Sequence, residues 1–184
     1  TELGNTDKIF SLLKECERMS INVISPNILT SFKEFVVNKN KDIEFGLGAI
    51  KGASSSFIDH IINIRKNNFF EDLWDFSRKI DIKMGGKKSL EALSYAGAFD
   101  SIAPSRTVAI KCVQDMLKDS SKGSALNGQS MDLFSTSNEK FDPYEKYLKT
   151  KDFSQSETLK LEKQSLGYYL SGHPVKAIEE KVSS

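Results

Sequence analysis

A glycine-punctuated turn that runs straight into an amphipathic helix is the feature that most constrains the fold of this chain. The stretch 45–65 reads FGLGAIKGASSSFIDHIINIR. Its glycines allow positive φ angles and the close approach of another molecule. Ser54 or Ser55 can cap a helix whose apolar residues recur at helical spacing. Such a turn collects backbone N–H groups at the positive end of a helix, so it predicts a site for one phosphate of a nucleic acid backbone.

A second unit of the same kind follows. The segment 96–100 reads AGAFD, and a helix is predicted over residues 105–118, after Pro104. Gly97 stands 45 positions after Gly52. Each unit is too small to bury its own apolar face, so we expect the two to pack together as an internal repeat. The alternative for Gly97 is an ordinary connection between two helices.

The spacing of apolar residues elsewhere predicts a mainly α chain with one small β-hairpin near its N-terminus. The runs 35–37 and 43–45 flank the polar stretch NKNKD, which suits a hairpin loop. Residues 119–141 are rich in Ser, Gly, Asn and Lys and too poor in apolar residues to order themselves, which predicts a flexible linker. Further helices are predicted over 6–19, 54–66, the stretch FFEDLWDFSRKI (69–80), 87–96 after a break at Gly85-Gly86, and 156–170.

Composition limits the classes of function. The chain has 184 residues, enough for a sizeable core. Its formal net charge of +1 argues against a free-standing protein that holds DNA by charge alone. Cys16 and Cys112 are expected to be core thiols in a reducing compartment. The sequence shows no signal peptide and no apolar run near 18 residues, so we expect a cytoplasmic protein with no membrane partner. A first residue of Thr1 suggests a segment of something longer.

Three motifs stand in a fixed order along the chain. They are FGLGAIKG with its following helix, LEALSYAGAFDS, and EKQSLGYYLSGHP. Their order and wording closely resemble the alpha subunits of bacterial DNA polymerase III, the C family of replicative polymerases, over essentially the whole chain. The resemblance implies the end of a fingers region with the β-hairpin at 1–45, a tandem helix-hairpin-helix domain at 46–118, the flexible linker at 119–141, and a helical segment leading toward an OB-fold at 142–184.

In that family the hairpin pair is expected to bind the backbone of duplex DNA without reading its sequence. Here Gly52 is followed by Ala53-Ser54-Ser55, where the family usually has a further glycine, so a weaker grip is implied. Arg65, at the far end of its helix, is expected to interact with the helix dipole instead. For each lysine, a solvated surface charge is the alternative. The DNA-binding residues implied by the resemblance are the turn amides of Gly48, Lys51 and Gly52, the Lys51 side chain, and then Lys87, Lys88, Gly97 and Arg106 near the second hairpin.

The linker contains a short peptide with its own implication. A glutamine followed by a terminal Leu-Phe is similar to the peptide by which replication proteins hold the sliding clamp, the beta subunit. A polar segment that exposes apolar side chains favours a partner groove that buries them, at roughly 1.5–3 kcal/mol for each large side chain. The alternative is that Leu133 and Phe134 dock on their own domain. The predicted clamp-binding residues are Gln129, Ser130, Met131, Asp132, Leu133 and Phe134.

The sequence offers no catalytic or metal-binding pattern. Nucleotidyl transfer needs carboxylates that hold two metal ions, and no Asp-x-Asp pair on a strand is found. The resemblance therefore implies a DNA-directed DNA polymerase as the parent chain, with Mg²⁺ and the other replicase subunits engaged elsewhere in it. The alternatives are a free-standing helix-hairpin-helix protein and, less favoured, a repair glycosylase or nuclease. Lys51 and Asp59 are the only candidates near the hairpin for the last. His60 is expected to face solvent or DNA, and His173 to be structural.

Overall fold

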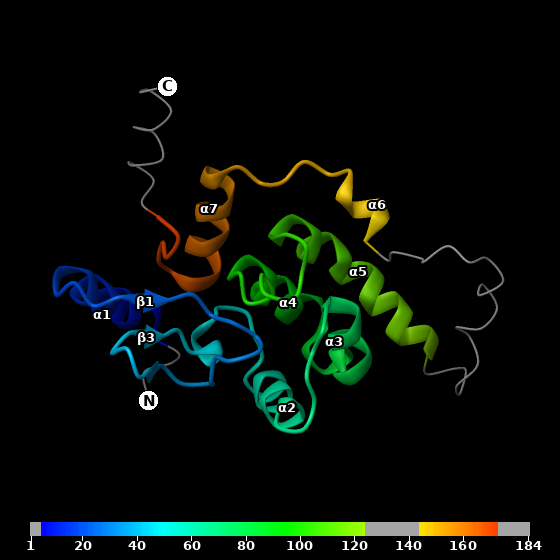
Figure 1. The fold of residues 1–184 in the computed structure, drawn as a ribbon, viewed down its shortest axis with the longest axis horizontal. Coiled ribbons are helices and arrows are strands. Elements are labelled where there is room, and N and C mark those ends of the chain that lie inside the picture. Colours follow the sequence, from blue (N-terminus) through cyan, green and yellow to red (C-terminus); the bar gives the residue numbers. More distant parts are fainter. Residues whose placement is uncertain (1–4, 124–143, 173–184) are drawn as a thin grey trace.

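The computed structural model describes residues 5–123 and 144–172, and it is mainly helical with one small sheet (Figure 1). This confirms the predicted fold class of a mainly α chain with a small β-hairpin. The proposed domain boundaries are not tested by this arrangement and stay predictions. Among the described residues, no helix is long and apolar enough to cross a membrane.

The N-terminal part combines a helix with the small sheet. Helix α1 (Thr6–Arg18) begins at Asn5, whose side chain accepts a hydrogen bond from the Lys8 amide. Strand β3 (Ile43–Glu44) pairs antiparallel with β2 (Val36–Val37), which is the predicted hairpin. Strand β1 (Val23–Ile24) adds to β3 in parallel, so the order in the sheet is β1-β3-β2.

The middle of the chain forms four helices. They are α2 (Ser55–Arg65), α3 (Leu73–Lys79), α4 (Ile82–Tyr95) and α5 (Arg106–Gly123), with a short 3-10 turn, η1 (Leu47–Ala49), before α2. Ser54 occupies the N-cap position of α2, but the side-chain cap predicted there is wrong, because its hydroxyl pairs with the Ser56 hydroxyl.

The predicted break at Gly85-Gly86 is confirmed, because the backbone angles of Gly86 (φ 62°, ψ −178°) are not helical and divide α4 into two parts. The part before the glycine pair, which starts at Ile82, was not predicted. One predicted boundary in this region needs correction. Helix α5 continues to Gly123, so the first residues assigned to the linker are helical. A Cβ at Gly85 would lie 2.4 Å from a ring carbon of Phe57, which explains why glycine allows α4 to pack closely on α2.

The last described part holds a short helix and a longer one. Helix α6 (Glu145–Leu148) was not predicted. Helix α7 (Gln155–Leu166) begins with a capping box between Ser154 and Glu157. It ends four residues earlier than predicted because Gly167 adopts a left-handed conformation, with φ 75°.

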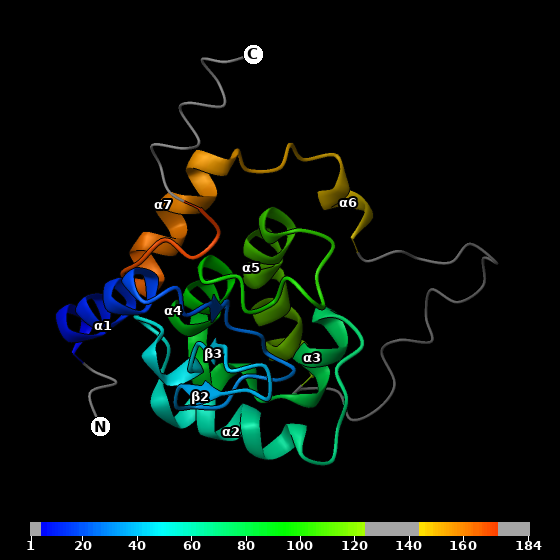
Figure 2. The same ribbon diagram turned by 60° about the vertical axis from the view of Figure 1, so that its left-hand side comes forward.

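One hydrophobic core joins these elements, with α4 packed against α2, α5 and α7. The aromatic stripe of the FFEDLWDF segment is core, as predicted, since Phe70, Leu73 and Phe76 are fully buried. Phe76 packs edge to face against both Phe70 and Phe99. Both views show α7 lying beside α4, with α1 near the C-terminal end of α7 (Figures 1 and 2). The Tyr168 hydroxyl donates to Glu17 of α1 at 2.6 Å. Helix α7 and its exit therefore join the N-terminal part to the helical core.

Candidate nucleic-acid interface

The first hairpin turn lies at the surface between η1 and α2. Lys51 and Gly52 are exposed, and Gly52 has a φ of +93° that side-chain-bearing residues rarely adopt. Its entrance is fixed by Gly46, where a Cβ would lie 2.6 Å from the Lys33 carbonyl oxygen. The turn is thus held at its base and open at its tip.

Two of the three amides predicted to hold a phosphate already have partners inside the protein. The Gly48 amide donates to the Lys33 carbonyl at 2.9 Å, and the Lys51 amide donates to the Ser165 carbonyl of α7 at 2.8 Å. The prediction of free amides at Gly48 and Lys51 is therefore wrong. The sequence could not reveal this, because the carbonyls that satisfy these amides come from distant segments.

An open groove of about 390 Å³ lies beside the exposed turn. Lys88 lies next to Gly52, since a Cβ built there would be 3.6 Å from Lys88 Cε. Lys87 forms an ion pair with Glu91 at 3.6 Å and is half exposed. Burial and the nearby Glu91 charge raise the pKa of Tyr95 above its usual value. The residues that line the groove come from the turn, α4 and α7: Lys51, Gly52, Lys88, Glu91, Ala92, Tyr95, Gln164 and Ser165.

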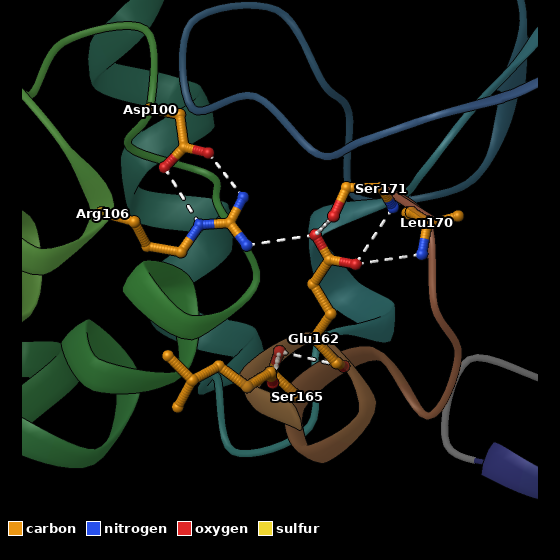
Figure 3. A network of polar contacts seen from close by, with 7 residues as sticks. Asp100, Arg106, Glu162, Ser165, Leu170 and Ser171 are labelled. Carbon is orange, nitrogen blue, oxygen red and sulfur yellow. Dashed lines mark hydrogen bonds and ion pairs between the residues drawn. The ribbon is translucent and has the colours of Figure 1, made fainter. Parts of the chain in front are cut away.

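The second hairpin turn is closed instead of open. Gly97 is buried with φ +78°, and its amide donates to the Ser94 carbonyl at 3.1 Å. The side chain of Arg106 at the start of α5 is only 12% exposed. It contacts Asp100 at 2.5 Å and Glu162 of α7 at 3.1 Å (Figure 3). The guanidinium therefore lies between the turn and α7.

Arg106 is largely buried and donates hydrogen bonds to both carboxylates, so the phosphate contact predicted for it does not fit the structure. Burial lowers the pKa of Arg106, but the hydrogen bonds and charges of Asp100 and Glu162 raise it by more, so the pKa lies above its usual value. The guanidinium is a permanent charge with two anionic partners. Gly97 likewise supports packing, since a Cβ there would lie 2.2 Å from Arg106 Nη2.

Glu162 is a buried residue of the site that the sequence did not predict. Its side chain is 1% exposed. It accepts hydrogen bonds from the amides of Leu170 and Ser171, at 3.0 and 3.1 Å, and from the Ser171 hydroxyl at 2.6 Å (Figure 3). A signal was available, because Glu162 lies three residues after Leu159 and four before Leu166, on their apolar face. A carboxylate at such a position needs buried donors.

The remaining candidates around the hairpins have structural partners. Asp59 forms an ion pair with Lys33 at 2.6 Å, and it does not line the groove that contains Lys51. Of the two residues considered as candidates for a repair enzyme, only Lys51 therefore lines this groove. His60 accepts a hydrogen bond from the Asp81 amide at 3.2 Å. Arg65 lies in the last turn of α2, where the expected interaction with the helix dipole is possible, and it also donates to the carbonyls of Ile28 and Ser31, at 2.7 and 2.9 Å.

Other predicted residues are either core or outside the described ranges. Cys112 is buried, as predicted, and burial raises its pKa to about 12. Cys16 is partly buried. The clamp-binding peptide 129–134 and His173 lie outside the described residues.

Two turns with positive-φ glycines, each followed by a helix and packed through one core, define a helix-hairpin-helix module. A family profile described as "Helix-hairpin-helix motif" matches residues 20–109. The chain is also similar to DNA polymerase III subunit alpha of Pasteurella multocida (37% identity over 179 residues), of Haemophilus influenzae (35% over 188) and of Escherichia coli K12 (34% over 179).

These alignments cover 95%, 100% and 95% of the chain but only 15%, 16% and 15% of the respective relatives. The chain is thus similar, over nearly its whole length, to one segment of these DNA polymerase III alpha subunits. This confirms the resemblance inferred from the three motifs.

Proposed function

We propose that this segment binds the backbone of duplex DNA, without reading its sequence, as part of a replicative DNA polymerase. The observation that supports this best is the exposed Gly52 turn with Lys51 and Lys88 beside it in one open groove. Lysine ammonium groups near an accessible backbone favour phosphate oxygens and carry no base information.

The two hairpins have unequal roles in this proposal. The first presents two lysines to the groove, whereas the charge of the second is neutralised by Asp100 and Glu162. Direct contacts are therefore assigned to Lys51, Gly52 and Lys88, with Lys87 contributing from the side of the groove. Gly97 and Arg106 support the module without touching DNA.

Binding to a labelled duplex, followed by fluorescence anisotropy between 50 and 200 mM salt, tests this function. We expect weak binding that is indifferent to sequence and falls as salt is added, since phosphate contacts release counterions. Lys88→Gln should weaken binding and reduce the salt slope by about 1. Lys149→Gln, at an exposed lysine that follows α6 and does not line the groove, is the matched control and should change neither. Sequence-selective or salt-insensitive binding would overturn the proposal.

The second part of the proposed function is tethering to the sliding clamp through residues 129–134. The support is the sequence QSMDLF, placed after the helix-hairpin-helix module in a segment matched by polymerase relatives. A modest clamp contact becomes effective once DNA holds both partners together, which would increase processivity. Leu133→Ala with Phe134→Ala should abolish clamp binding, measured by surface plasmon resonance, and leave duplex binding unchanged. Unaltered clamp affinity in the double variant would refute this assignment.

The polymerase reaction and the other replicase partners are proposed for the longer protein, in the cytoplasm. Among the described residues, no three His, Cys, Asp or Glu side chains are placed to hold a metal ion together. Asp72 caps α3, and Asp100 forms an ion pair with Arg106. We therefore derive no Mg²⁺-dependent step from this segment.

A further inference from the structure

The last turn of α7 contacts both hairpins at once. Its Ser165 carbonyl accepts the Lys51 amide of the first hairpin at 2.8 Å. Three residues earlier, in the same turn, Glu162 contacts Arg106 of the second hairpin at 3.1 Å. Gln164 and Ser165 also form one wall of the groove that contains Lys51 and Lys88. The orientation of this single turn thus sets both the groove wall and the link between the hairpins.

Glu162 fixes how that turn is rotated about the helix axis. Its carboxylate is held by Arg106 on one side and by the segment after α7, through Leu170 and Ser171, on the other (Figure 3). Both oxygens are used: Oε1 accepts from Arg106 and the Ser171 hydroxyl, and Oε2 accepts from the two amides. A side chain held from several directions in the interior permits little rotation of the helix that carries it.

We propose that Glu162 is a positioning residue for DNA binding: it orients the last turn of α7 so that the Ser165 carbonyl holds the Lys51 amide and the groove stays open to the DNA backbone. Glu162 touches no DNA. The inference rests on the function proposed above for the groove, but the hydrogen bond at Lys51 can be measured without DNA.

Because Glu162 is negatively charged, its replacement can either strengthen or weaken DNA binding, and the direction of the change distinguishes two explanations. Removing a negative charge close to bound phosphates strengthens binding by simple electrostatics. A positioning role predicts the opposite, because Glu162→Gln loses the ion pair with Arg106 and loosens the groove wall. The direction of the change in affinity therefore separates the two effects.

The experiment compares Glu162→Gln with the wild-type chain in duplex affinity across salt and in amide hydrogen exchange at Lys51. We expect affinity about threefold to tenfold weaker, an unchanged salt slope, and faster exchange at Lys51. Glu145→Gln removes the same charge from an exposed site on α6 and is the matched control. It should leave the exchange at Lys51 unchanged.

Equal or tighter DNA binding by a folded Glu162→Gln variant would overturn the proposal, and so would unchanged exchange at Lys51. If that variant does not fold, Ser171→Ala, which removes one donor to Glu162, is judged by the same two measurements. If the wild-type chain itself fails to bind duplex DNA, the proposed function fails. Exchange at Lys51 then still decides whether Glu162 orients the first hairpin.

Discussion

The two hairpins of this molecule share a local design and differ in what lies over them. Each has a glycine with positive φ, +93° at Gly52 and +78° at Gly97, followed by a helix. Gly52 is exposed beside two lysines, whereas Gly97 is buried under an arginine held by two carboxylates. The same local design can therefore either expose a turn to a ligand or bury it in the core, depending on what distant segments pack against it. Here α7 pairs with the arginine of the second hairpin and leaves the tip of the first one exposed.

The strongest test of this contrast is the removal of Arg106. Arg106→Ala leaves Glu162, only 1% exposed, as a buried charge without its cationic partner. Breaking a buried pair in this way costs about 3–5 kcal/mol of stability. Urea unfolding followed by circular dichroism measures the loss.

Arg78→Ala is the control, because that arginine side chain is 56% exposed and lies 3.8 Å from Asp75. We expect it to cost less than about 1 kcal/mol. Similar losses in the two variants would show that the second hairpin is not closed by its arginine.

A pair of glycine substitutions compares the turns directly. In Gly97→Ala the new Cβ would meet Arg106 Nη2 at 2.2 Å and Asp100 Oδ2 at 2.9 Å, and Arg106 is held too firmly to move aside cheaply. Clash and backbone strain together cost about 2–4 kcal/mol. In Gly52→Ala the nearest atom is Ala92 Cβ at 3.4 Å.

Backbone strain alone then costs Gly52→Ala about 1–2 kcal/mol. The two unfolding free energies, measured side by side, should rank Gly97→Ala as the more destabilised. The reverse order would mean that the exposed turn is the more constrained of the two.

The sequence predicted the helices, strands and turns better than the long-range contacts that surround them. Periodicity located six of the described helices and the hairpin strands, because apolar spacing reflects which face is buried. It missed α6, a helix of four residues with too few positions to show a period. The positive φ angles of Gly52 and Gly97 could also be predicted, since glycine in a turn between helices commonly adopts such a conformation.

The predictions of site residues were wrong where the residue has a partner far away in the sequence. Arg106 and the amides of Gly48 and Lys51 look available in the sequence, and their partners lie 56, 15 and 114 positions away, at Glu162, Lys33 and Ser165. Local spacing carries no information about such pairs. The sequence indicated Lys51, Gly52 and Lys88 as binding residues. It did not predict the rest of the groove lining, which includes Gln164 and Ser165.

The smallest expected effect concerns the contacts between α5, the helix that follows the second hairpin turn, and α6. Asp115, midway along that helix, accepts hydrogen bonds from Lys146 at 2.7 Å and from the Tyr147 hydroxyl, both on α6. These contacts lower the pKa of Asp115 from 3.8 to about 2. A carboxylate whose pKa is depressed by folding adds stability above its unfolded pKa and loses it as the pH falls. The contribution should be present near neutral pH and should disappear between about pH 4 and pH 2.

Asp115→Asn removes this contribution, which we place on the order of 1 kcal/mol because the side chain is partly solvent-screened. The difference in unfolding free energy between wild type and variant should therefore shrink as the pH is lowered from 5 to 2. Asp7→Asn, at an exposed position on α1, controls for the loss of a carboxylate in general. A constant difference across this range would mean that the negative charge of Asp115 does not help to hold α6 on α5. The closure of the second hairpin would then be confined to Arg106 and its two carboxylates.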